Sequence, residues 1–159
     1  MDPLRRRLGA ASTITTRGKK VSAMAVDTDR ATEERLRAMF QSESLEDLAR
    51  AQHDLAAEDF VEEWPQSGER IRGRDNAKAI NDNYPQMTGT TPRMSLRRIK
   101  GEGAHWTIEG TIDYGDGTPV SYVGIAEVRD GKLVHISEYF ANPFEAPAWR
   151  SRWVERIAD

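Results

Sequence analysis

Glu138 is the residue of this chain whose setting best suits chemistry. It lies near the end of an expected strand over residues 132–140. Because side chains alternate between the faces of a strand, Glu138 shares a face with the apolar Val134, Ile136 and Phe140. A carboxylate that looks into an apolar cavity has a pKa tuned for proton transfer. The alternative interpretation is structural, with the acid at a solvated edge or paired with an arginine.

The sequence offers little for metal, nucleotide or cysteine chemistry. It contains no cysteine, which excludes disulfides and thiolate sites and fits a reducing, cytoplasmic compartment. His135 and Glu138 are three residues apart on one strand and point to opposite faces, so they cannot chelate a metal together. His53 and His105 lack partners at ligand spacing, and no glycine-rich loop precedes a helix. We therefore expect no metal and no cofactor.

Charge is distributed unevenly along the chain. Residues 1–26 hold six basic residues and one acidic residue, although the whole chain has a net charge of −3. The remaining body is therefore acidic, which argues against nucleic acid as a partner. No apolar run has the length of a membrane span, so we expect no membrane partner. We predict that residues 1–26 form a disordered basic tail, with Met24 as an alternative start, and that residues 27–159 form one domain.

Three helices are predicted in the first half of the chain. The first spans about residues 28–42 and carries an apolar stripe. Ser44, with Asp47 three residues later, is typical of the start of a second helix. A third helix is expected to be capped by Asp75 and ended by Pro85.

The hydrophobic period changes from helical to alternating in the second half. A short strand at 58–64 with a return at 70–72 comes before the third helix, and four longer strands are expected at about 93–100, 104–114, 119–129 and 132–141. Short connections make the four neighbours antiparallel, and so long a meander must curl. The predicted fold class is α+β: a cone-shaped, strongly bent mixed or antiparallel sheet wrapped around three N-terminal helices, with a C-terminal helix and a pocket where the helices leave space.

The C-terminal helix is expected to start near Pro147. Trp149, Trp153 and Ile157 recur at intervals of four residues and form one stripe. Such a stripe usually packs, either as a lid over the sheet or across a dimer interface.

The order of these elements resembles the SnoaL-like branch of the nuclear transport factor 2-like superfamily. The resemblance covers about residues 28–142. It rests on the short strand that ends at 63–65 (Glu-Trp-Pro), the Gly-Arg-Asp helix start at 73–75, the Asp-Gly-Lys hairpin at 130–132 and the Glu-Tyr-Phe strand end at 138–140. The resemblance implies a cone fold, frequently dimeric, with a pocket for a small, mostly apolar molecule. Relatives include polyketide cyclases, ketosteroid isomerases and limonene epoxide hydrolases, so the fold alone does not settle the function.

Carrying the relatives' catalytic residues over to this chain gives a mixed result. The position of the isomerase general base, just before a proline, holds Trp64 here. The epoxide hydrolases have an acid just before Tyr-Phe on the last strand, which corresponds to Glu138, and a second acid that corresponds to Glu109, while their bridging arginine is lost. Gln66 corresponds to a water-holding amide. The resemblance therefore implies Glu138 and Glu109 as a catalytic pair that shares a proton.

Strand parity disagrees with the resemblance about Glu109. Apolarity places Trp106, Ile108 and Ile112 inward, which sends Glu109 outward, whereas the pair requires it inward. Both faces of the strand could be covered, with one lining the pocket and the other packed on a partner subunit or the C-terminal helix, or a bulge near Gly110 could shift the register. We expect Glu109 in the pocket. The expected cavity-lining and substrate-binding residues are Glu62, Trp64, Gln66, Tyr84, Tyr122 and Phe140.

Two functions remain open at this point. The first is a cofactor-independent hydrolase, isomerase or cyclase that uses paired carboxylates on a small apolar substrate. The second is a non-catalytic ligand-binding or dimerisation module, in which the acids pair with arginines such as Arg93 or Arg97 and side chains fill the cavity. The direction in which Glu62, Glu109 and Glu138 point would discriminate between them.

Overall fold

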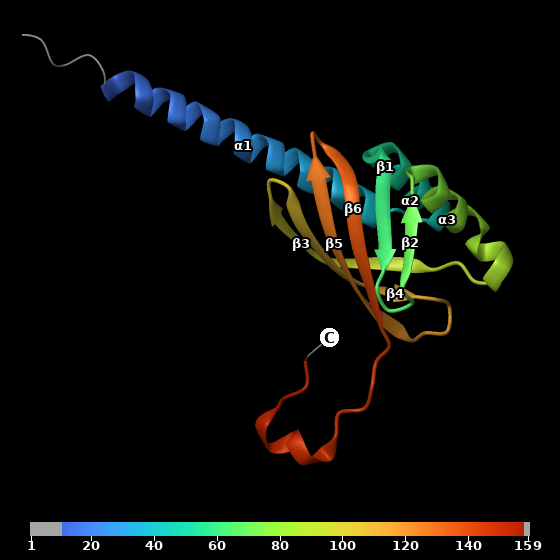
Figure 1. The fold of residues 1–159 in the computed structure, drawn as a ribbon. Coiled ribbons are helices and arrows are strands. Elements are labelled where there is room, and N and C mark those ends of the chain that lie inside the picture. The colour runs from blue at the N-terminus through green and yellow to red at the C-terminus, as the bar shows by residue number, and fades with distance from the viewer. Residues whose placement is uncertain (1–10, 158–159) are drawn as a thin grey trace, which may run out of the picture.

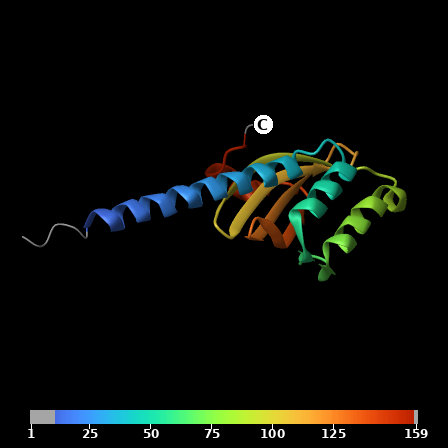
Figure 2. The ribbon, with the colours of Figure 1, turned by 90° about the horizontal axis from the view of Figure 1, so that it is seen from above.

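The computed structural model describes residues 11–157, with side chains from residue 21 onward. A single six-stranded sheet forms the body, and three helices lie against one of its faces (Figures 1 and 2). This arrangement is the α+β cone that the sequence predicted. Within the described residues, no helix combines the length and apolar character that a membrane span requires.

Helix α1 (Ala11–Phe40) is longer than predicted, and its N-terminal half projects away from the body (Figure 1). The part of α1 that packs on the body begins near Asp29, where the sequence predicted the start of a helix. There Asp29 Oδ1 accepts a hydrogen bond of 2.9 Å from the Gly103 amide, in the turn between strands β3 (Arg93–Glu102) and β4 (His105–Asp113). Residues 21–28 are exposed. The structure has a helix over residues 11–26, where the sequence predicted a disordered tail, and a helix nucleated at its packed end extends at low cost. Residues 1–10 of that tail lie outside the described residues.

Helices α2 (Leu45–Leu55) and α3 (Arg74–Thr88) follow the predicted order. Ser44 caps α2 as predicted, with its hydroxyl accepting a hydrogen bond of 3.1 Å from the Asp47 amide. Two details of α3 differ from the prediction. Gly73, and not Asp75, occupies the N-cap, and Pro85 lies inside the last turn. The helix ends at Gly89, whose φ of 74° is the left-handed conformation that glycine adopts readily.

The sheet is mixed and has the order β2-β1-β6-β5-β4-β3. Its strands are β1 (Ala56–Trp64), β2 (Glu69–Arg72), β3 (Arg93–Glu102), β4 (His105–Asp113), β5 (Pro119–Arg129) and β6 (Lys132–Ala141). The meander from β3 to β6 is antiparallel, and β1 pairs with β6 in parallel. The parallel pair brings the acids of β1 beside those of β6.

The core lies on the helical face of the sheet. Leu36, Met39 and Phe40 of α1 pack against alternate residues of the strands, among them Ile108 and Ile136. Burying apolar area of this kind contributes about 25 cal/mol per Å². The opposite face of the sheet, called the outer face below, has no helix of residues 11–157 packed against it (Figure 2).

The C-terminal segment differs from the prediction in length and packing. A short 3₁₀ helix, η1 (Ala148–Trp153), begins after Pro147 as expected, but no long helix follows. Trp149, Trp153 and Ile157 are exposed instead of packed. The whole segment points away from the sheet (Figure 1).

Candidate active site

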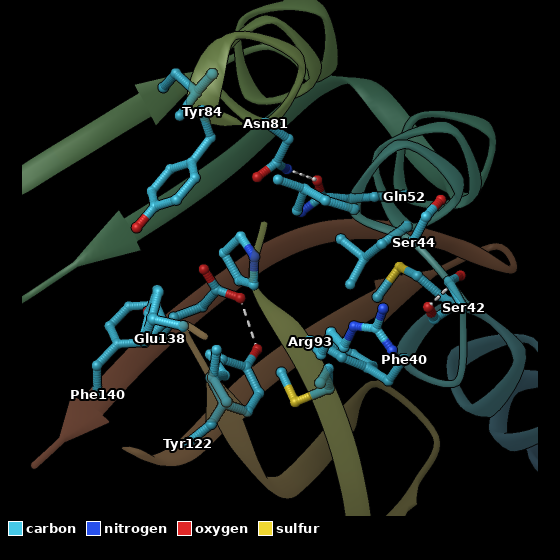
Figure 3. A pocket seen from close by; sticks show the side chains of 18 of the residues that line it. Phe40, Ser42, Ser44, Gln52, Asn81, Tyr84, Arg93, Tyr122, Glu138 and Phe140 are labelled. Carbon is cyan, nitrogen blue, oxygen red and sulfur yellow. Dashed lines mark hydrogen bonds between the residues drawn. The ribbon is translucent and has the colours of Figure 1, made fainter. Parts of the chain in front are cut away.

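A cavity of about 530 Å³ lies between the sheet and the helices. Its walls come from the α1–α2 connection, one side of α3, and the ends of the strands near the start of β3 and the end of β6. Figure 3 shows Glu138, Tyr122 and Phe140 on one side of the cavity, facing Ser42 and Arg93 on the other. A cavity of this size, mostly apolar with a few polar groups, is typical of a site for a small molecule.

Glu138 lies in the wall of this cavity and is held from two directions. The Tyr122 hydroxyl donates a hydrogen bond of 2.6 Å to Oε1, and the Trp64 indole donates one of 2.9 Å to Oε2 (Figure 3 for Tyr122). Burial, followed by the charge of Glu138, holds the pKa of the Tyr122 hydroxyl well above its usual value, so Tyr122 remains a donor. Two donors aimed at the two oxygens of one carboxyl group fix its orientation.

Gly124 creates the space that this contact needs. It lies directly opposite Glu138 in the β5–β6 register. A Cβ atom at this position would lie 2.6 Å from the Tyr122 hydroxyl oxygen and 3.2 Å from a methyl carbon of Ile136. Only glycine therefore allows the Tyr122 ring to lean across its neighbour and reach Glu138.

Glu62 is the second acid of the cavity. Its side chain is 4% exposed and shares the inner face of β1 with Phe60 and Trp64. Burial, and then the negative charge of Glu138, raise the pKa of Glu62 to about 9. At neutral pH, Glu62 is therefore a carboxylic acid beside the Glu138 carboxylate, and the two groups together hold one proton.

A chain of two amides leads to Glu62 from the helices. The Gln52 amide donates a hydrogen bond of 3.1 Å to Glu62 Oε2, and the Asn81 amide donates one of 3.3 Å to Gln52 Oε1 (Figure 3 for Asn81 and Gln52). Gln52 is buried on α2, whereas Asn81 comes from α3. The two helices therefore position the acid that the sheet carries.

The acid pair has no basic partner among the described residues. Neither Glu62 nor Glu138 forms an ion pair with any lysine, arginine or histidine of residues 21–157. Arg93 lines the opposite side of the cavity (Figure 3). Over the same part of the chain, no three acid or histidine side chains are placed to hold a metal ion. Without a cation nearby, a second negative charge on this pair of carboxyl groups is disfavoured. The pair therefore combines one protonated acid with one carboxylate that can act as a base.

Two further tyrosines stand on the side of α3. The rings of Tyr84 and Tyr114 are 6.4 Å apart, and both line the cavity. Burial raises the pKa of the Tyr114 hydroxyl. Tyr114 therefore keeps its proton at neutral pH, and its hydroxyl can donate a hydrogen bond to a polar group of a ligand.

The fold and cavity agree with a comparison against protein families. A family model described as a SnoaL-like domain matches residues 33–136. The chain belongs to the SnoaL-like domain family. The matched region includes Glu62 and ends two residues before Glu138. Members of this family are often isomerases, cyclases or hydrolases.

Solved structures of the same fold support the assignment. A nuclear transport factor 2-like protein of unknown function from Burkholderia xenovorans is 42% identical, with a TM-score of 0.72 over 81% of this chain and 97% of the other. A proposed ketosteroid isomerase from Kribbella flavida is 25% identical, with a TM-score of 0.67 over 82% and 93%. An epoxide hydrolase of Mycobacterium tuberculosis that resembles limonene epoxide hydrolase, 23% identical with a TM-score of 0.52 over 74% and 84%, shares the fold. No curated protein matches the chain.

Glu109 does not lie in the cavity of this SnoaL-like domain, so the predicted pair of Glu109 and Glu138 is wrong. Glu109 is on the outer face of β4 and forms an ion pair with Arg98. That arginine, followed by the charges of Arg97 and Lys100, holds the pKa of Glu109 below its usual value. A register shift does occur, but it lies in β3 between Leu96 and Arg98 and leaves the parity of β4 intact. Strand parity was therefore correct and the resemblance was misleading at this position.

Gln66 is also outside the cavity. Its side-chain amide bonds to both the backbone carbonyl and the backbone amide of Phe140. Gln66 thus ties the turn after β1 to the end of β6, and it has no contact with the cavity that could hold a water molecule. Its role is to fix the strand ends that carry Trp64 and Glu138.

The remaining predicted residues line the cavity: Glu62, Trp64, Tyr84, Tyr122, Glu138 and Phe140. Trp64, which stands at the position of the isomerase base in this superfamily, directs its indole N–H at Glu138. At this position the chain therefore carries a hydrogen-bond donor to Glu138.

Sequence reasoning missed Gln52, Asn81 and Tyr114. A signal for Gln52 exists, since it falls on the apolar stripe of α2 between Leu48 and Leu55. A polar side chain on a buried stripe requires a hydrogen-bond partner, and here the partner is Glu62. No comparable sequence pattern marks Asn81 and Tyr114, because the residues that they contact in the cavity belong to other helices and strands.

Proposed function

We propose that this SnoaL-like domain is a cofactor-independent acid–base enzyme that acts on a small, mostly apolar molecule. The observation that carries the proposal is the pairing of Glu138 with Glu62 in one apolar cavity. Burial and the neighbouring charge of Glu138 keep the Glu62 carboxyl group protonated at neutral pH, and an acid placed beside a second carboxyl group is how enzymes separate an acid from a base. The described cavity has the volume of a small-molecule site.

Glu138 has the role of the base. Trp64 and Tyr122 hold its carboxylate in one orientation, so that it removes a proton from a carbon of the substrate or from an attacking water. Glu62 has the role of the acid and gives its proton to the substrate oxygen on which negative charge develops. One proton is taken and one is returned, so the pair ends the reaction holding one proton and resets by moving it between its two carboxyl groups.

Gln52 and Asn81 are positioning residues in this scheme. The Gln52 amide donates to Glu62 Oε2, which leaves the other carboxyl oxygen of Glu62 to carry the proton. Asn81 fixes the Gln52 amide in turn. Orientation of the acid by neighbouring groups reduces the reorganisation needed when charge develops.

The same pair serves isomerisation, cyclisation or hydrolysis, because each reaction takes a proton from one atom and delivers one to another. The related protein from Kribbella flavida is described as an isomerase and that from Mycobacterium tuberculosis as an epoxide hydrolase. Arg93, opposite the acids, favours a substrate with a polar group at the end remote from the reacting atoms.

A ligand-binding module without catalysis is the alternative. The observation in its favour is that both oxygens of Glu138 already accept hydrogen bonds, which also suits a rigid binding site. The form of this alternative in which side chains fill the cavity conflicts with the cavity volume.

A substrate-independent test uses the base-catalysed ring opening of nitrobenzisoxazole, a small flat molecule whose C–H is removed by a carboxylate to release a coloured phenolate. We expect the wild-type protein to accelerate this reaction and Glu138→Gln to lose the acceleration by about 100-fold or more. Glu109→Gln is the matched control, since its carboxylate is on the outer face, and should keep the wild-type rate. Equal rates for wild type and Glu138→Gln would rule out Glu138 as a base and favour the binding module.

A further inference from the structure

The cavity carries opposite charges on its two sides. On one side, Glu62 keeps its proton beside the Glu138 carboxylate at neutral pH, so the acid pair holds one negative charge. Arg93, the first residue of β3, lies on the other side (Figure 3). Among the described residues that line the cavity, Arg93 alone has a basic side chain. The cavity therefore has a negative side, where the acids are, and a positive side at Arg93.

The guanidinium group of Arg93 is available to a ligand. Asp113 lies directly opposite Arg93 in the β3–β4 register, where an arginine and an aspartate usually pair. The Asp113 carboxylate instead accepts a hydrogen bond of 2.7 Å from the Gly115 amide in the following turn. Arg93 forms no ion pair with Asp113, with Glu43 of the cavity wall, or with any other carboxylate of residues 21–157. Its positive charge is therefore not neutralised by this part of the chain.

A carboxylate is the anion that fits this side of the cavity. A guanidinium group binds a carboxylate through two parallel hydrogen bonds. Ser95, two residues later and on the same side of β3, also lines the cavity and offers a hydroxyl donor. A phosphate monoester, with about two negative charges, would meet a single cation here, while Glu43 and the acid pair would repel it. The charges of the cavity therefore favour an anion with one negative charge.

This distribution of charge would orient an anionic molecule in the cavity. Arg93 attracts the charged end of the molecule, and the acid pair repels it. The wall includes the apolar side chains of Met39, Met94 and Ile112, and charges that face each other across an apolar space are screened less than charges in water. The uncharged end of the molecule is therefore directed toward the acid pair.

We propose that the substrate is an amphipathic monocarboxylate, an apolar skeleton whose carboxylate binds Arg93 and whose other end reaches Glu138 and Glu62. The inference rests on the proposed function for the reaction at that second end, whereas the binding of the carboxylate does not require catalysis. Arg93 is then a residue that determines specificity. A neutral group in place of the carboxylate would leave the guanidinium group without its partner, and such a loss discriminates strongly between ligands.

The first test compares matched acids and amides by isothermal titration calorimetry. The probes are the straight-chain carboxylates from phenylpropanoate to phenylheptanoate with a terminal phenyl group, each beside its primary amide, which has nearly the same volume and no charge. For the chain length that binds most tightly, we expect the wild-type protein to bind the carboxylate about 10-fold or more tightly than the amide. If no carboxylate of the series binds more tightly than its amide, the proposal is overturned.

Variants of two arginines on β3 show whether Arg93 is the cause of this preference. Arg93→Gln should weaken the binding of the carboxylate by about 10-fold or more and change the binding of the amide by less than about two-fold. Arg97→Gln is the matched control, because it removes the same charge from the same strand outside the cavity wall, and it should keep the wild-type preference. Both arginines are exposed, so both variants should fold, with unchanged thermal unfolding. Equal losses of carboxylate affinity in the two variants would refute a direct contact with Arg93.

Phenylalkyl phosphates of the same lengths test the class of anion. We expect each phosphate to bind no more tightly than the carboxylate of equal length, and a phosphate that binds about 10-fold more tightly would refute the proposed monocarboxylate. These titrations involve no turnover, so they are independent of the ring-opening test. A wild-type protein that prefers carboxylates but does not accelerate ring opening would refute the acid–base function and support the ligand class. Acceleration without a preference for carboxylates would refute the ligand class alone.

Discussion

The carboxyl groups of Glu62 and Glu138 meet in one cavity because strand β1 pairs in parallel with strand β6. Glu62 lies opposite Ile136 in that register, and Glu138 follows two residues later on the same face. The parallel pairing is the only one in the sheet, since the meander is antiparallel. The contact between the two acids therefore depends on the parallel pairing of β1 with β6.

The pH dependence of stability should reveal the buried acid. The pKa of Glu62 is raised from 4.5 to about 9 by folding, so the folded state binds more protons than the unfolded state between these values. Stability from this group is present in full below about pH 4.5 and is lost as the pH rises toward 9, by at most about 1.4 kcal/mol per pH unit. Glu62→Gln, measured by urea unfolding between pH 5 and 9, should remove this slope. An identical pH profile in both proteins would show that Glu62 ionises normally.

Tyr122→Phe should weaken the fold through the loss of one hydrogen bond. The ring and its packing against Phe40 remain, but Glu138 loses its donor at 2.6 Å. Removing a hydrogen-bond donor from a half-buried charged group costs about 1.5–3 kcal/mol in the free energy of unfolding, measured by chemical unfolding at pH 7. Tyr139→Phe is the control, since that tyrosine is partly exposed on the outer face, and its stability should change little. Equal stability of the two variants would contradict the contact between Tyr122 and Glu138.

Gly124→Ala should displace the Tyr122 hydroxyl, from which its new methyl group would lie only 2.6 Å away. We expect a loss of about 1–3 kcal/mol in the free energy of unfolding. In the background of Tyr122→Phe, the hydroxyl is already absent, so the same glycine substitution should cost less. Additive losses in the double variant would show that the two residues do not interact.

Glu109→Gln tests whether Glu109 takes part in the reaction. Its carboxylate pairs with Arg98 on the outer face, so we expect turnover of nitrobenzisoxazole, and of any natural substrate, to stay within about two-fold of wild type. Glu138→Gln in parallel should lose about 100-fold or more. A comparable loss of turnover in both variants would show that Glu109 is part of the active site.

The sequence predicted the fold well because its elements are local. Alternation and hairpin glycines placed β3 to β6 within a few residues, and Ser44 with Asp47 marked the start of α2. Most cavity residues followed from parity, since Glu62, Trp64, Glu138 and Phe140 alternate correctly along β1 and β6. Pairs of residues were harder to predict, because no local pattern shows which two strands are adjacent.

The partner of Glu138 illustrates this limit. The resemblance pointed to Glu109, and parity alone placed that residue outside, as the structure has it. Glu62 was visible as a cavity residue, but its role as the second acid requires the parallel contact of β1 with β6. The sequence also did not predict that α1 starts at Ala11. An unpacked helix and a coil both lack an apolar stripe, so the sequence pattern does not separate them.

The most direct test of the shared proton is carbon-13 NMR of the glutamate side-chain carboxyl groups as a function of pH. The account predicts one glutamate that keeps the chemical shift of a protonated carboxyl group through neutral pH and titrates near 9, and that is absent from the spectrum of Glu62→Gln. If every glutamate of the wild-type protein is ionised by about pH 6, Glu62 and Glu138 do not share a proton and the proposed acid–base pair does not exist.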